Sequence, residues 1–159
     1  LGVGSIDSFL REVDAINLSR RARVADLARE VVGGDLAGLH VAVLGIAFKP
    51  GSDDVRDSPS LSVCDQLARE GAIVRVHDPV AARNAALIRP DLHYADTVAE
   101  AADGADVILH LTEWADYRAI DPVALGHVVR RRNIVDARCA LDAEYWRSAG
   151  WFVRILGRP

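Results

Sequence analysis

The sequence predicts an α/β protein with a Rossmann-like, doubly wound and mainly parallel sheet, preceded by a long N-terminal helix. Two observations carry this prediction. Short apolar runs of strand length alternate with helical patterns from residue 40 to the end of the chain, which is typical of parallel βαβ units. The first apolar run leads directly into a long polar loop, as strands do where open parallel sheets bind their ligands.

The N-terminal helix is predicted because apolar residues recur at three- and four-residue steps from Ile6 to Val31. Ser5 is available as its cap, and Gly33 with Gly34 would end it. A helix of this size measures about 40 Å at 1.5 Å per residue, which is more than a small domain needs to cover its sheet. We therefore expect something outside this domain to bury part of its apolar face. The alternative is a peripheral helix packed wholly on its own sheet.

A polar connection is expected at residues 35–38. Five strands are predicted after it, at residues 40–44, 73–76, 107–111, 133–135 and 152–155. Helices fit between them, one ending near Gly71 and the others at residues 80–87, 97–102, 123–128 and 143–149. Cys64 falls on the apolar face of the first of these helices, together with Leu61 and Leu67. That position favours core packing over a nucleophile.

Composition excludes several classes of function. The chain has 159 residues, half of them hydrophobic, and a net charge of −4, which fits one domain with an appendage. The longest basic run, Arg130 to Arg132, is interpreted as a solvated helix end, so neither a nucleic acid nor a membrane is expected as a partner. Cys64 and Cys139 are too few for a disulfide framework or a zinc site, which predicts reduced thiols in the cytoplasm. Because the sequence contains no methionine and begins with Leu1, we expect it to be a piece of a longer protein.

The loop after the first strand is the strongest candidate site. It holds Lys49 and Arg56, and it closes on Ser58 and Pro59, an N-cap followed by proline at the first helical position. Backbone donors, the positive end of a helix and two cations would converge there on an anion. The alternative is an ordinary loop whose lysine and arginine are solvated.

This loop lacks the three-glycine fingerprint of a dinucleotide site, because it reads Gly45-Ile-Ala-Phe-Lys49. Asp78 lies well past the usual ribose-binding spacing and is interpreted, with Pro79, as a turn at the end of a strand. The fold is thus predicted to have lost its own NAD site, which leaves side chains such as Lys49 and Arg56 to hold another anion.

Two further loops, residues 110–114 and 136–140, follow strands and are expected to face the same cleft. Arg138 is the better ligand candidate, since a guanidinium can form paired hydrogen bonds to a phosphate or to a uracil or ribose oxygen. Trp114 is either a lid residue or part of the core.

The same loops contain Glu113, His110 and Asp136, which invite the hypothesis of a general acid. We do not favour it, because no nucleophile or base lies at a supporting spacing. Cys139 lies beside Arg138, but the apolar run around it predicts burial.

Five motifs together resemble one family. They are Val41-Ala-Val-Leu-Gly-x-Ala-Phe-Lys-Pro50, Asp53-Asp-x-Arg-x-Ser-Pro59, Val76-His-Asp-Pro79, Leu111-Thr-Glu-Trp114 and Asp136-x-Arg138. The chain resembles the C-terminal, UDP-binding part of the UDP-glucose 6-dehydrogenases, within the wider nucleotide-sugar dehydrogenase family. Residues 9–17 are similar to the end of the long central helix of that family, so residues 1–34 are expected to form a dimerisation helix and residues 35–159 the UDP-sugar-binding domain.

The resemblance implies an NAD-dependent, two-step oxidation of the sugar C6 alcohol to a carboxylate through a thioester on a catalytic cysteine. That cysteine, the catalytic lysine and the NAD fingerprint are expected upstream of Leu1, so this chain alone should be inactive. Neither Cys64 nor Cys139 matches the family's cysteine motif. The alternatives are a dehydrogenase for UDP-N-acetylmannosamine or GDP-mannose, and a non-catalytic module that binds a nucleotide sugar or dimerises.

Residue by residue, the resemblance assigns Phe48, Lys49 and Arg138 to the UDP-sugar and Arg56 to NAD held by another domain. Two positions depart from the family pattern. Ala137 stands where glycine is common, and Ser52 where threonine is frequent. The first departure raises the question of whether the backbone before Arg138 needs a glycine.

Overall fold

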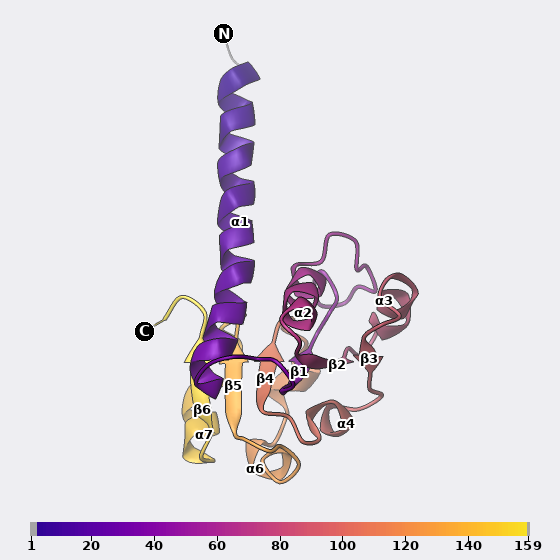
Figure 1. Cartoon of the computed structure of the whole chain (residues 1–159), viewed down its shortest axis with the longest axis vertical. Helices are drawn as coiled ribbons and strands as arrows, with labels where there is room; N and C mark the ends of the chain where they lie inside the picture. Colours follow the sequence, from indigo (N-terminus) through magenta and orange to yellow (C-terminus); the bar gives the residue numbers. More distant parts are fainter. Residues whose placement is uncertain (1–2, 159) are drawn as a thin grey trace.

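The structure is a computed structural model that describes the backbone of residues 3–158 and the side chains of residues 11–158. Six parallel strands form one sheet in the order β3-β2-β1-β4-β5-β6, with helices on both faces. The chain runs outward from β1 in both directions, so the topological switch lies between β1 and β4 (Figure 1). The predicted α/β, doubly wound class is confirmed.

The five predicted strands are all present, with ends that differ by at most one residue. The strands are β1 His40–Leu44, β2 Ile73–His77, β3 His93–Tyr94, β4 Val107–His110, β5 Asn133–Asp136 and β6 Phe152–Ile155. Strand β3 was not predicted, because it has only two residues and no apolar run. It pairs at the edge of the sheet, through Arg75 and Val76 of β2.

The helices are α1 Val3–Val32, α2 Pro59–Arg69, α3 Ala82–Ile88, α4 Val98–Ala102, α5 Ala115–Arg118, α6 Pro122–Leu125 and α7 Ala143–Ser148. Ser58 caps α2 as predicted, since its hydroxyl accepts from the amide of Leu61 and Pro59 occupies the first helical position. The one-turn helix α5 was not predicted. Helix α6 ends at Leu125, earlier than the apolar pattern indicated.

Helix α1 extends well beyond the domain (Figure 1). It begins at Val3, so Ser5 lies inside the helix and its prediction as the cap is wrong. It ends as predicted at Gly33, where a φ of +84° lets the amides of Gly33 and Gly34 reach the carbonyl of Arg29.

The two ends of α1 differ in burial. Val24, Ala25, Leu27 and Ala28 are buried near its C-terminus, whereas residues 11–20 are exposed. The alternative of a helix packed wholly on its own sheet is therefore wrong. The side chains of Ile6, Phe9 and Leu10, which the apolar pattern includes, lie outside the described residues.

The core has one apolar layer on each face of the sheet. One layer joins α1 and α2 to residues such as Val41 and Val43, and the other includes Ala42, Leu44 and the edge-to-face pair Trp146 and Trp151. Cys64 is fully buried in the first layer, as predicted.

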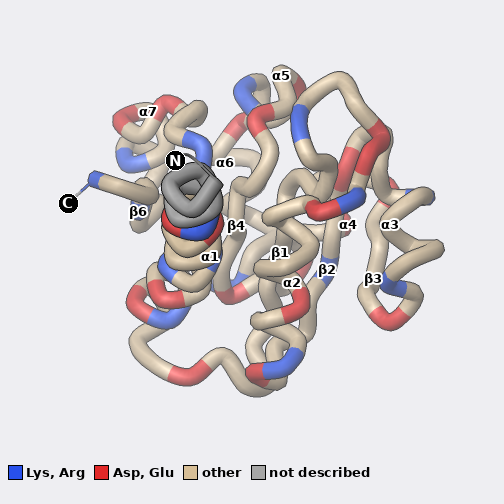
Figure 2. The backbone as a smooth tube through the Cα atoms, turned by 90° about the horizontal axis from the view of Figure 1, so that it is seen from above, with Lys and Arg blue, Asp and Glu red and all other residues tan. Residues whose placement is uncertain are grey.

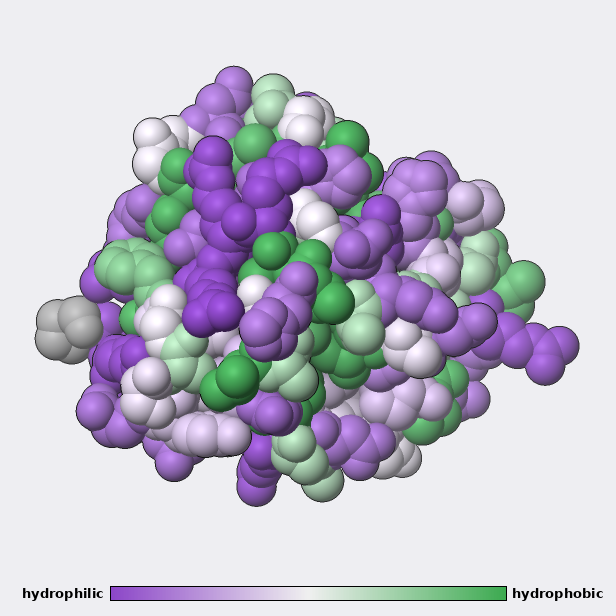
Figure 3. All heavy atoms as spheres, turned by 90° about the horizontal axis from the view of Figure 1, so that it is seen from below, coloured by the Kyte–Doolittle hydropathy of each residue, from purple (hydrophilic) through white to green (hydrophobic). Residues whose placement is uncertain are grey.

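The basic run Arg130 to Arg132 was predicted to end a helix, but it lies in the bend before β5. Arg130 and Arg131 pair there with the buried carboxylate of Asp106, which explains why they gather at that point. Figure 3 views the molecule from below, and hydrophilic residues are interspersed with hydrophobic ones on that face. Within the described part of the chain, no helix has the length and hydropathy needed to cross a bilayer.

Candidate functional site

The loops that follow β1, β4 and β5 meet α1 around a cleft of about 330 Å³. Apolar side chains such as Val24, Val63 and Leu111 line it together with Phe48 and Arg138. Viewed from above, basic and acidic residues are interspersed around this end of the molecule (Figure 2). A cleft with an apolar lining and cations suits a ligand that combines a flat ring with negative charge.

Helix α1 also contributes to the cleft, which sequence reasoning missed. The helix lines the cleft with Asn17, Arg20 and Arg21. An adjoining hollow of about 640 Å³ is lined by Arg20, Arg118 and Arg138. Two neighbouring arginines on a predicted helix were a usable signal, but the periodicity alone did not say which face meets the sheet.

The loop after β1 passes close to the loop after β4. Gly45 has a φ of +93°, and a Cβ atom there would lie 2.4 Å from Cβ of Thr112, so only glycine fits. The hydroxyl of Thr112 donates to the carbonyl of Ala47 (2.9 Å), and the hydroxyl of Ser58 donates to the carbonyl of Ile46 (2.7 Å). The chain is thereby fixed immediately before Phe48.

Asp78 is buried and accepts five hydrogen bonds, whereas the sequence indicated only a turn at this residue. Its carboxylate accepts hydrogen bonds from the amides of Ile46 (2.7 Å), Ala47 (3.0 Å), Val80 (3.0 Å) and Ala81 (2.7 Å) and from the indole nitrogen of Trp114 (3.2 Å). The turn is confirmed, because the bonds to Val80 and Ala81 hold the chain as it leaves β2. Trp114 packs against both apolar layers, so it is part of the core and not a lid.

The candidate substrate residues Phe48 and Arg138 are brought together, since both line the cleft. Phe48 is half exposed, and its amide donates to the carbonyl of Asp54 (2.9 Å), which folds the loop back on itself. Lys49 follows Phe48 directly and is exposed.

Arg56 lies apart from these residues, beside a separate hollow that Ser52 and Asn84 also line. Its guanidinium donates twice to Asp54, at 3.0 and 2.8 Å, and its side chain is 84% exposed. This ion pair lowers the pKa of Asp54 to about 2. Arg56 is thus held by a carboxylate but remains accessible from outside the domain.

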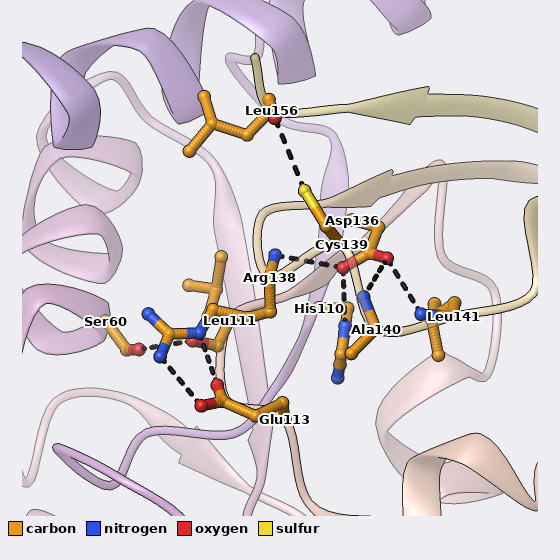
Figure 4. Close-up of polar contacts among 10 residues, drawn as sticks. All are labelled: Ser60, His110, Leu111, Glu113, Asp136, Arg138, Cys139, Ala140, Leu141 and Leu156. Atoms are coloured by element: carbon orange, nitrogen blue, oxygen red, sulfur yellow. Dashed lines mark hydrogen bonds and ion pairs between the residues drawn. The ribbon is translucent and has the colours of Figure 1, made fainter. Parts of the chain in front are cut away.

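Arg138 donates to both carboxylate oxygens of Glu113, with Nη2 3.0 Å from Oε1 (Figure 4), and both residues line the adjoining hollow. The hydrogen bonds of Arg138 lower the pKa of Glu113, and Glu113 in turn raises the pKa of Arg138. Both groups are therefore charged at neutral pH, and an anionic ligand has to compete with Glu113 for the guanidinium.

Asp136 fixes the loop that carries Arg138. It lies 2.8 Å from Nδ1 of His110 and accepts from the amides of Arg138 (3.0 Å), Ala140 (2.8 Å) and Leu141 (2.9 Å) (Figure 4). Burial alone would raise the pKa of Asp136, but these hydrogen bonds outweigh it and lower the pKa. With His110 and Asp136 both buried, their arrangement supports a loop and does not present a general acid to a ligand.

The backbone on either side of Arg138 tests the expectations about Ala137 and Cys139. Ala137 has no positive φ, so a glycine is not required there. The left-handed residue is Cys139, with a φ of +56°. Cys139 is exposed, and the prediction that it is buried is wrong, because the turn points its side chain toward the carbonyl of Leu156 and not into the core.

NAD does not fit the crevice of this chain's own sheet. In a dinucleotide-binding fold the amides of the first loop face the pyrophosphate. Here the amides of Ile46 and Ala47 are already bonded to the carboxylate of Asp78, whose charge would repel a phosphate.

Comparison with known proteins agrees with this geometry. Residues 42–143 match the family model described as "UDP-glucose/GDP-mannose dehydrogenase family, UDP binding domain". The UDP-glucose 6-dehydrogenase YwqF of Bacillus subtilis (strain 168) is 33% identical over 151 residues, which cover 94% of this chain and 34% of that protein. The chain thus spans about a third of the length of this relative.

Two solved structures share the fold. A UDP-glucose dehydrogenase from the archaeon Pyrobaculum islandicum has a TM-score of 0.73 and 30% identity, over 89% of this chain and 32% of that one. An NDP-N-acetyl-D-galactosaminuronic acid dehydrogenase from Methanosarcina mazei Go1 has a TM-score of 0.77 and 27% identity, over 87% and 29%.

Proposed function

The chain belongs to the UDP-glucose/GDP-mannose dehydrogenase family, and we propose that it is the UDP-sugar-binding C-terminal part of an NAD-dependent UDP-glucose 6-dehydrogenase. In this proposal residues 1–34 are the central helix and residues 35–159 the UDP-sugar-binding domain. The observation that carries it is the cleft beside α1 that Phe48 and Arg138 both line.

The chemistry of the cleft suits a UDP-sugar. Phe48 offers an exposed aromatic face, and Arg138 offers two parallel N–H donors to a phosphate or a sugar oxygen. Lys49 adds a mobile point charge at the next position. Charge-assisted hydrogen bonds of this kind are about twice as strong as neutral ones, so these cations would contribute most of the affinity.

NAD is proposed to be held outside this chain, because Asp78 occupies the amides of the first loop. NAD would accept the hydride that is removed from C6 of the sugar. Arg56 is the residue placed to reach it, since its guanidinium is exposed on the side of the loop away from the cleft.

The two cysteines of this chain are not proposed as the nucleophile. Cys64 is buried, and burial raises the pKa of its thiol to about 12. Cys139 does not line the cleft that Phe48 and Arg138 share. The purified chain alone is therefore expected to form no NADH from UDP-glucose. The unpaired state of both cysteines fits a cytoplasmic protein.

The test separates the two cations of the loop. In the complete protein, Lys49→Ala should raise the KM for UDP-glucose and leave the KM for NAD nearly unchanged, while Arg56→Ala should do the reverse. Each lost charged hydrogen bond costs roughly 1.5 to 3 kcal/mol, or about one to two decades in kcat/KM. Equal effects of both variants on both ligands, or no effect of either, would show that the loop is only scaffold.

A second candidate is a dehydrogenase for another nucleotide sugar, which the similarity to the Methanosarcina enzyme favours. Turnover of the complete protein with UDP-glucose, UDP-N-acetylgalactosamine, UDP-N-acetylmannosamine and GDP-mannose would decide between the candidates. A preference of at least tenfold in kcat/KM for one of the other three nucleotide sugars would replace UDP-glucose as the substrate.

Dimerisation through α1 is also proposed, because the exposed part of the helix carries Val13, Ile16 and Leu18. Sedimentation should give a dimer at micromolar concentration, and Ile16→Glu should weaken it. The matched control is Leu87→Glu, which alters an exposed leucine on α3. A monomer in the unmodified protein would refute the proposal.

A further inference from the structure

We propose that Asp78 is an internal anion that replaces a bound phosphate at the first loop of the fold, and that it thereby positions Phe48 and Lys49. Only the second part rests on the proposed function, since it requires Phe48 and Lys49 to contact the substrate. The first part rests on geometry alone.

The position of the carboxylate is that of a phosphate in a dinucleotide-binding fold. Oδ2 of Asp78 accepts from two successive amides, those of Ile46 (2.7 Å) and Ala47 (3.0 Å), directly beyond the end of β1. Successive amides at the carboxyl end of a first strand form the usual concave site for a phosphate oxygen. In this chain the anion comes from the end of β2.

The same carboxylate ties three loops together. Oδ1 accepts from the amides of Val80 (3.0 Å) and Ala81 (2.7 Å) in the loop after β2, while the indole of Trp114 brings in the loop after β4. All five donors are neutral N–H groups, and Asp78 is only 5% exposed. A buried charge held by N–H groups in this way is an anion site whose anion is covalently attached.

The arrangement fixes the loop from both sides. Asp78 holds the amides of Ile46 and Ala47, and the hydroxyls of Ser58 and Thr112 hold their carbonyls. The amide and the carbonyl of both Ile46 and Ala47 are therefore hydrogen-bonded. Phe48 and Lys49 are consequently presented outward from a rigid base, which reduces the entropy lost when they bind a ligand.

The proposal predicts chemical rescue by a small carboxylate. Asp78→Ala in the complete protein leaves the amides without an acceptor but makes room for formate. Its melting temperature should fall and then rise again with millimolar formate, whereas neutral formamide of similar shape should not restore it. Asp78→Asn keeps the shape and one acceptor, so it should fold, but it should not respond to formate because no space is freed.

Asp106→Asn is the control for the cost of neutralising a buried carboxylate elsewhere, because Asp106 accepts from the amide of His40 at the amino end of β1. This variant should lose stability without any response to formate. An equal response of Asp78→Ala to formate and formamide, or to neither, would overturn the internal anion.

The positioning role has its own readout. Asp78→Ala and Asp78→Asn should each raise the KM for the UDP-sugar roughly tenfold or more with little change for NAD, and formate should reverse this in Asp78→Ala only. Unchanged KM values in both variants would overturn the role in positioning. If the unmodified protein bound no UDP-sugar, the proposed function would fail, while rescue of stability by formate would still establish the anion.

Discussion

Glu113→Gln is predicted to strengthen the binding of UDP, because Glu113 holds the guanidinium of Arg138 that the ligand is proposed to use. The side chain of Arg138 is 38% exposed and that of Glu113 is 30% exposed, so solvent screens the ion pair. Its net interaction free energy is therefore about 1 kcal/mol or less. When a ligand displaces Glu113 from Arg138, the protein loses this interaction free energy, which lowers the affinity for the ligand. Removing the charge should therefore tighten UDP binding by no more than about fivefold.

Isothermal titration of the complete protein with UDP at low salt would measure this difference. Glu144→Gln is the matched control, because it removes the exposed ion pair with Arg147 on α7, away from the cleft. Arg138 lowers the pKa of Glu113 below its ordinary 4.5, so Glu113 stays ionised at neutral pH. The gap between variant and unmodified protein should persist there and close only as the pH falls below 4.5. Weaker binding by Glu113→Gln would refute the reasoning and show that Glu113 orients Arg138 for the ligand.

Two further predictions concern the packing around the site. Gly45→Ala should lower the free energy of unfolding by at least about 2 kcal/mol, because it combines a positive φ with a Cβ contact of 2.4 Å to Thr112; Gly157→Ala, with a similar φ and no neighbour within 4 Å, should cost clearly less in the same denaturant titration. A thiol reagent followed by mass spectrometry of peptides should label Cys139 in the native protein and Cys64 only after unfolding, because burial raises the pKa of Cys64 to about 12; labelling of both at equal rates would contradict the buried position of Cys64.

Features that depend on local patterns could be predicted from the sequence. The central strands consist of continuous apolar runs, so β1 and β4 were found to within one residue, and Ser58 with Pro59 marked the start of α2. Strand β3 could not be predicted, because it has only two residues and they pair at the edge of the sheet. Local pattern carries no signal for such a short element, whose position depends on its neighbours.

Of the candidate site, the sequence indicated only the residues that are proposed to contact the ligand. Phe48, Lys49 and Arg138 stand in motifs after strands, but the roles of Arg20 and Asp78 depend on contacts between segments far apart in the chain. Arg20 reaches the cleft because α1 packs against β5 and β4. Asp78 looked like a simple turn because the spacing to Ile46 says nothing about which side chain turns back toward which amide.

The two loops that carry the proposed ligand cations share one construction. Asp78 stands just beyond β2 and holds the loop before Lys49, and Asp136 ends β5 and holds the loop that carries Arg138. In both cases a buried carboxylate accepts hydrogen bonds from several backbone amides. These hydrogen bonds stabilise the negative charge inside the domain and hold the loop rigid. The exposed cations then keep their charge for a ligand. This division is compatible with the proposed anion-binding cleft in a protein whose net charge is −4.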